Sequence, residues 1–166
     1  MVTDHGDAAW HDHTRQARRP ILEAHHLRKA YDGRPALRDL SFSLDAGRIL
    51  GFLGPNGAGK TTAIRILTTI LEQDEGEFTI AGISSRDPEG IRRRIGVLPE
   101  SQGYPKDMRA IDYLVYFGRL YGRPASEAKR IGWELLEAVG LHQRATSLIG
   151  SYSRGMRQRL GIARAL

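Results

Sequence analysis

The chain has 166 residues, a length that allows one domain able to bury about two thirds of its unfolded surface. The absence of cysteine excludes disulfides and thiolate metal sites and suits a reducing cytoplasm. The net charge is +6, but basic residues are scattered among acidic ones except at 92–94, which we interpret as a solvated helix turn. With no run of about 18 uncharged apolar residues and no apolar core near the N-terminus, we expect neither a membrane span nor a secretory signal.

Residues 1–19 are polar and show no hydrophobic periodicity, so we expect a disordered tail there. Its histidines at 5, 11 and 13 raise the possibility of a metal site. No supporting carboxylate geometry is evident, and a solvated tail is the simpler interpretation.

The segments that follow the tail read as a set of strands. Residues 20–27 and 37–44 are typical of strands, and so is 77–81, which Gly82 closes. The turn residues of 31–33 and 45–47 are expected to reverse the chain after the first and second strands.

Residues 54–62 read Gly-Pro-Asn-Gly-Ala-Gly-Lys-Thr-Thr and match the phosphate-binding pattern G-x-x-x-x-G-K-[ST]. The apolar run 48–53 before the loop predicts a buried parallel strand. Residues 61–71 after it predict a helix whose apolar positions recur at helical spacing: Ile64, Leu67, Ile70 and Leu71. Strand, glycine loop and helix form the context in which the pattern indicates a nucleotide-binding loop.

The residue types of the loop fit that chemistry. Glycines at 54, 57 and 59 let the backbone approach a phosphate closely, and successive N–H groups can then point at it, aided by the helix dipole. Lys60 is expected to neutralise the β- and γ-phosphates, and the Thr61 hydroxyl to ligate Mg²⁺. The candidate binding residues are Gly54, Pro55, Asn56, Gly57, Ala58, Gly59, Lys60, Thr61 and Thr62.

Beyond this loop the pattern becomes mainly helical. Residues 88–94 predict a helix, 95–98 a short buried strand, and the chain from Ala110 onward a series of helices. Gly140 is a plausible helix C-cap. Two apolar stripes are expected to face a core: Ile111, Leu114, Val115, Phe117, Leu120 and Tyr121, then Ile131, Leu135, Leu136 and Val139.

A second motif opens the last helix, which runs to Leu166. Ser153 is a good N-cap, and Gly155 leaves the amides of the first turn open to an anion. Together with the P-loop, this motif resembles the signature sequence of the ATP-binding-cassette (ABC) ATPases, Leu-Ser-Gly-Gly-Gln. At those five positions the chain has Tyr152, Ser153, Arg154, Gly155 and Met156. The variant resembles the branch that powers ABC-2-type exporters of drugs and antibiotics.

The resemblance implies an α/β P-loop NTPase of the ABC type, covering residues 20–166. It would have a RecA-like core with a parallel sheet, an antiparallel β subdomain and a helical signature subdomain, with the C-terminal part of the core missing. Residues 20–99 would hold the β subdomain and P-loop core, and 100–166 the Q-loop and helical part.

It also implies site residues and partners. ATP and Mg²⁺ would bind, with Tyr31 stacking on adenine and Glu100, at the position of the usual Q-loop glutamine, near the metal. Ser153, Arg154, Gly155 and Met156 would contact the ATP of a second cassette in a head-to-tail dimer. The exposed part of the segment 104–121 would dock a coupling helix of a multi-spanning membrane permease, which would hold the protein at the inner face of the cell membrane. No nucleic-acid partner is implied.

The resemblance implies ATPase activity, but this chain by itself is expected to lack hydrolysis. No apolar run ends in Asp-Glu, so the Walker B aspartate and the catalytic glutamate are absent, as is the switch histidine expected further on. Without that buried strand, the chain alone should be marginally folded at best. Two alternatives stay open: a non-transport ABC protein such as a translation or DNA-repair factor, and a nucleotide-binding remnant without turnover.

Overall fold

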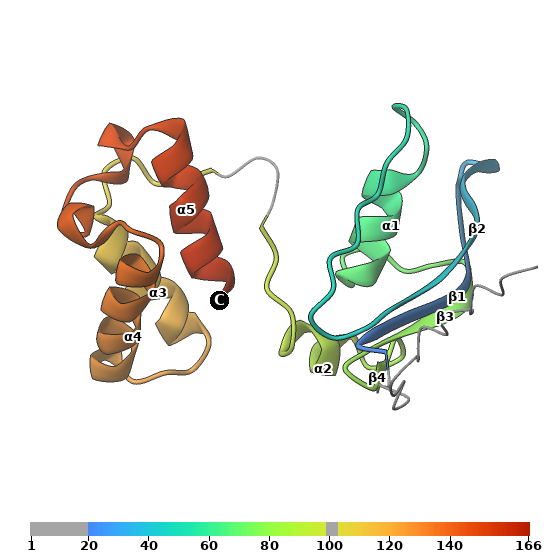
Figure 1. Ribbon diagram of the computed structural model, residues 1–166, viewed down its shortest axis with the longest axis horizontal. Coiled ribbons are helices and arrows are strands. Elements are labelled where there is room, and N and C mark those ends of the chain that lie inside the picture. The colour runs from blue at the N-terminus through green and yellow to red at the C-terminus, as the bar shows by residue number, and fades with distance from the viewer. Residues whose placement is uncertain (1–19, 99–102) are drawn as a thin grey trace, which may run out of the picture. The chain divides into compact units, whose positions relative to one another are not determined.

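The computed structural model describes residues 20–98 and 103–166, which fall into two compact units that divide between Arg94 and Ile95 (Figure 1). The predicted tail and Glu100 lie outside the described residues. The division that we predicted between residues 99 and 100 also lies there, and it stays a prediction.

The first unit is built on a four-stranded antiparallel sheet of order β2-β1-β3-β4. Its strands are β1 (Leu22–Tyr31), β2 (Arg34–Leu44), β3 (Glu75–Ile80) and β4 (Ile83–Ser84). The three predicted strands of this region are therefore confirmed: the first and third have both ends shifted, and the second begins earlier than predicted but ends at the predicted residue. Asp32 and Gly33 both have positive φ, at 48° and 75°, which is the backbone of a tight two-residue hairpin turn.

Two helices complete this unit, α1 (Lys60–Leu67) and α2 (Pro88–Arg92). The α1 helix buries Ala63, Ile66 and Leu67 and makes its contacts with the sheet through β2. The helix that we predicted over 61–71 is confirmed in its first part and ends at Leu67. Of its four apolar positions, Leu67 is buried and Leu71 half-buried, whereas Ile64 and Ile70 are exposed.

Two segments that we predicted as buried strands, residues 48–53 and 95–98, are not strands in the structure. Ile49 is 98% exposed and Leu53 95%, although the ring of Phe52 packs edge-on against Phe42 of β2, at 5.8 Å between ring centroids. A strand exists only through a hydrogen-bonded neighbour. Within residues 20–98 and 103–166 every strand pair is antiparallel, and neither segment has such a neighbour.

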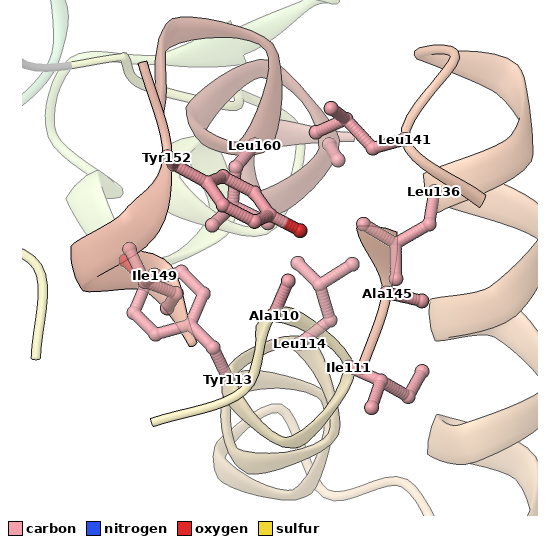
Figure 2. Packing of buried hydrophobic residues seen from close by; sticks show 11 residues of the cluster. Ala110, Ile111, Tyr113, Leu114, Leu136, Leu141, Ala145, Ile149, Tyr152 and Leu160 are labelled. Atoms are coloured by element: carbon pink, nitrogen blue, oxygen red, sulfur yellow. The ribbon is translucent and has the colours of Figure 1, made fainter. Parts of the chain in front are cut away.

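The second unit is helical, with α3 (Ala110–Leu120), α4 (Ala125–Ala138), α5 (Arg154–Ala165) and two short 3₁₀ turns, η1 (His142–Arg144) and η2 (Ile149–Ser151). Its core, shown in Figure 2, gathers side chains from all three helices and from the segment between α4 and α5. The buried members are Ala110, Ile111, Tyr113, Leu114, Leu136, Leu141, Ala145, Ile149, Tyr152, Leu160 and Ala163.

The apolar stripe that we predicted on α3 is partly confirmed. Ile111 and Leu114 are buried, and Phe117 packs against the edge of the core. Leu120 and Tyr121 are 63% and 74% exposed, so the C-terminal end of the stripe does not face the core.

The predicted C-cap of α4 is confirmed. Gly140 N–H donates to the Glu137 carbonyl at 2.9 Å, and Leu141 N–H donates to the Leu136 carbonyl at 2.7 Å. These two bonds form a Schellman motif, which ends the helix and turns Leu141 into the core.

Candidate nucleotide-binding site

The loop between β2 and α1 follows a path that two of its glycines make possible. Gly57 and Gly59 have φ near +83° and +82°, in the left-handed region that other residues avoid. Gly59 also lies against β2, and a Cβ there would stand 2.4 Å from the Ala36 carbonyl oxygen. A Cβ on Gly57 would meet no atom within 4 Å. The missing side chain of Gly59 thus allows the loop to lie against the β2 backbone, whereas Gly57 borders open space.

The start of α1 is suited to an anion. The cap residue Gly59 offers no side chain, and the first turn of this eight-residue helix carries no acidic residue. The amide groups of that turn therefore keep their capacity to donate to a bound group, and the positive end of the helix dipole adds to the attraction. The cradle that glycines leave at 54 and 57, together with this uncapped helix start, fits a phosphate chain.

Lys60 is the first residue of α1, and its ammonium group reaches back over the loop. Nζ donates to the Gly54 carbonyl at 2.8 Å and to the Pro55 carbonyl at 2.6 Å. The cation is therefore held at the mouth of the loop. The Thr61 side chain is exposed beside it, and Thr62 is half-buried.

Tyr31 lies at the end of β1 in the same unit, next to the hairpin turn and paired with Arg34 across it. Its side chain is 43% exposed. An exposed aromatic ring at a strand end can present a face to a planar ligand. Its stacking role stays a prediction, because no contact of the described residues tests it.

The second predicted motif begins α5 in the helical unit. The Ser153 hydroxyl accepts a hydrogen bond from Met156 N–H at 3.2 Å, which confirms the predicted N-cap. Arg154 and Gly155 are exposed, while Met156 packs partly against the core. The side chains available to a partner at this helix start are therefore those of Ser153 and Arg154, beside the bare backbone of Gly155.

Sequence reasoning missed what holds this helix start in place. Tyr152 is buried, its ring directed into the core (Figure 2), and its hydroxyl donates to the Arg144 carbonyl at 2.7 Å. Arg157 donates to the Tyr152 carbonyl at 2.5 Å, and the Tyr104 hydroxyl donates to the Arg157 carbonyl at 2.6 Å. Tyr152, an aromatic residue at the first signature position, could have indicated a side chain anchored in the core. The bond from Tyr104 could not have been predicted, because it joins residues 53 positions apart and no sequence pattern links them.

Burial shapes the ionisation of both tyrosines. Desolvation, with a smaller contribution from the nearby Tyr113 hydroxyl, raises the pKa of Tyr104 to about 12 against the opposing charges of Arg164 and Arg157. Burial also raises the pKa of Tyr152, while Arg144 acts in the opposite direction. Both phenols therefore stay protonated, and both remain hydrogen-bond donors at neutral pH.

Two predicted sites fall outside the described residues. Glu100, the predicted metal ligand at the Q-loop position, belongs to the undescribed segment 99–102, and the three histidines of the tail belong to 1–19. Within the part of the chain that the structure describes, no group of three or more His, Asp or Glu side chains could hold a metal ion.

Known proteins resemble the chain over most of its length. Residues 37–166 match the family described as ABC transporter. The linearmycin resistance ATP-binding protein LnrL of Bacillus subtilis is 35% identical over 147 residues, which are 88% of this chain and 47% of that protein. The doxorubicin resistance ATP-binding protein DrrA of Mycobacterium tuberculosis is 42% identical over 129 residues, which are 77% of this chain and 39% of that protein.

A solved structure supports the same relation. The ATP-binding subunit of an ABC transporter superposes with a TM-score of 0.73 at 30% identity, covering 87% of this chain and 61% of that one. The expected α/β architecture with an antiparallel β unit and a helical unit is therefore confirmed. The chain spans about half the length of the curated relatives it matches. From the P-loop, the signature helix and these matches, the chain belongs to the ABC transporter family.

Proposed function

We propose that the chain is part of the ATP-binding component of an ABC exporter, in which ATP binding and hydrolysis drive the export of a small molecule through a separate membrane subunit. The observation that carries the proposal is the loop 54–62, with its left-handed glycines and the Lys60 ammonium held across its mouth. The names of the relatives, resistance proteins for linearmycin and doxorubicin among them, support export over other roles.

In this proposal each part of the loop has one task. The backbone N–H groups of the loop and of the first turn of α1 donate to the phosphates, and Lys60 neutralises their charge. The Thr61 hydroxyl, together with Glu100, holds Mg²⁺, and Tyr31 stacks on the adenine. When bound, the metal neutralises the charge that develops on the transferred phosphoryl group.

The start of α5 serves a second copy of the cassette. Ser153, Arg154, Gly155 and Met156 contact the ATP held by the partner's loop, so that two composite sites form in a head-to-tail dimer. The cap that Ser153 closes and the core anchor at Tyr152 support this role, because they fix the helix start that must face the phosphate.

The permease docks on the helical unit. Tyr116 and Leu120 in the C-terminal half of α3 are exposed, as is Tyr121 just after it, and a separate groove at the N-terminus of α3 is lined by Lys106, Met108 and Arg109. Exposed apolar side chains on a helix suit the apolar face of an amphipathic coupling helix. None of the helices in the described ranges is both long and apolar enough to cross a bilayer. Docking on the permease would hold the chain at the cytoplasmic face of the membrane.

We further propose that residues 1–166 alone bind ATP without turning it over, because no apolar run in them ends in Asp-Glu. The test is calorimetric titration with Mg-ATP alongside an assay of phosphate release. We expect saturable binding that Lys60→Ala abolishes, and no phosphate release. Absence of Lys60-dependent binding would contradict the nucleotide site, and Lys60-dependent turnover would contradict the proposal that residues 1–166 do not hydrolyse ATP.

The export role needs its own experiment. A tagged chain, solubilised with its native membranes, should co-purify with a multi-spanning protein. Association with ribosomes or DNA in its place would favour a non-transport ABC factor.

A further inference from the structure

The carboxylate of Asp74 ties down the end of β1, immediately before Tyr31. We propose that Asp74 is a positioning residue for the base of the bound nucleotide: it fixes the strand end from which the Tyr31 ring stacks. The inference rests on the proposed ATP-binding function and adds to it a residue outside the P-loop, the signature and the Q-loop.

The tie begins where the pairing of β1 with β3 ends. The last paired residues are Arg28 and Glu75, and Asp74 N–H donates to the Arg28 carbonyl at 2.9 Å. Beyond that point the Asp74 side chain takes the place of a strand. Its Oδ2 accepts from Ala30 N–H at 2.8 Å, and its Oδ1 accepts from Lys29 Nζ at 2.5 Å.

The other neighbour of this strand end is β2. Ala30 lies opposite Pro35, and the register of β1 with β2 shifts between Lys29 and Ala30. The Ala30 N–H points to the other side of β1, where pairing with β3 has already ended at Arg28. Asp74 therefore supplies a backbone hydrogen bond on the β3 side of β1, one residue before Tyr31.

The same contacts stabilise the ionised form of the Asp74 carboxylate. The hydrogen bonds from Lys29 and then from the Ala30 amide hold the pKa of Asp74 below its usual range. The Lys29 side chain is 16% exposed but that of Asp74 is 45% exposed, so solvent screens the ion pair, and the hydrogen bond to the Ala30 amide is the contact that fixes the strand end. The neighbouring ion pair joins the exposed side chains of Arg28 and Glu75, and the Glu75 carboxylate bonds to the Arg28 guanidinium rather than to a β1 amide, so Glu75 serves as a matched control.

The experiment compares two probes on the 166-residue chain: Mg-ATP and inorganic triphosphate, which has no base. Base–aromatic stacking predicts that Tyr31→Ala weakens ATP binding about tenfold. Asp74→Ala, which frees the strand end, should weaken ATP about fivefold. Triphosphate binding should not change in either variant, and Glu75→Gln should change neither ligand. In the Tyr31→Ala background, Asp74→Ala should cause no further loss of ATP binding.

Asp74→Asn keeps an oxygen that can accept from Ala30 N–H but loses the ion pair, so we expect a loss of ATP affinity smaller than that of Asp74→Ala. If Asp74→Ala does not fold, Asp74→Asn is used in its place. Equal losses of ATP and triphosphate, no loss of either, or a loss that persists in the Tyr31→Ala background would overturn the positioning role. If the unmodified chain does not bind ATP, or binds it as well as Lys60→Ala does, the proposed function itself fails, and the positioning role fails with it.

Discussion

Replacing Gly59 by alanine tests whether the P-loop is shaped by its contact with β2. A Cβ at this position would lie 2.4 Å from the Ala36 carbonyl oxygen and 3.3 Å from Leu37 Cδ1. The left-handed backbone, at φ +82°, costs a non-glycine residue about 1–2 kcal/mol. The crowding adds about 1–3 kcal/mol, the usual cost of overpacking, because a backbone oxygen cannot move aside as a side chain can.

Gly57→Ala is the matched control, since φ is +83° there but nothing lies within 4 Å of the added Cβ. We expect urea unfolding followed by far-UV circular dichroism to show a loss of about 2–5 kcal/mol for Gly59→Ala and about 1–2 kcal/mol for Gly57→Ala. The difference between the two measures the contact with β2 alone. Equal destabilisation by both substitutions would refute the reasoning, because it would leave backbone conformation as the only cost.

Three further predictions concern the helical unit. Leu160→Ala, at a fully buried position, should cost about 2–5 kcal/mol in thermal unfolding, whereas Ile162→Ala on the exposed side of α5 should cost far less; similar losses would contradict the assigned core. Ser153→Ala removes the cap of α5 and should cost about 0.5–2 kcal/mol by the same measurement, and an unchanged unfolding midpoint would show that the cap is not needed. The raised pKa of Tyr104, about 12 against 10.0, means that its contribution to stability is complete below pH 10 and is lost as the pH rises through 12. Tyr104→Phe should therefore remove one late step from the absorbance titration of tyrosinate and flatten the fall in stability over that range; an unchanged titration would contradict the assignment.

The features that could be predicted from the sequence are those encoded in neighbouring residues. The Asp32-Gly33 pair predicts the hairpin of β1 and β2, and Ser153 predicts the start of α5. Both predictions succeed because the turn and the cap involve only residues within a few positions of each other. The glycine pattern of the P-loop is equally local.

What could not be predicted depends on partners distant in the chain. The segment 48–53 has the composition of a buried strand, but whether it becomes one is decided by a neighbouring strand rather than by its own residues. The support of Tyr31 comes from Asp74, which bonds to a residue 44 positions away, and no pattern in either segment reveals the pair. The same holds for the bond from Tyr104 to the first turn of α5.

The most direct test of the nucleotide site is an NMR titration of the ¹⁵N-labelled 18.5 kDa chain with Mg-ATP. The account predicts that the amide signals of the loop 54–62 and of the first turn of α1 shift with a common saturation curve, together with those around Tyr31. Inorganic triphosphate should shift the loop signals and leave those around Tyr31 in place. Shifts confined to the tail or to the helical unit, with the glycine signals of the loop unmoved at saturating ATP, would contradict the assignment of this loop as the phosphate site.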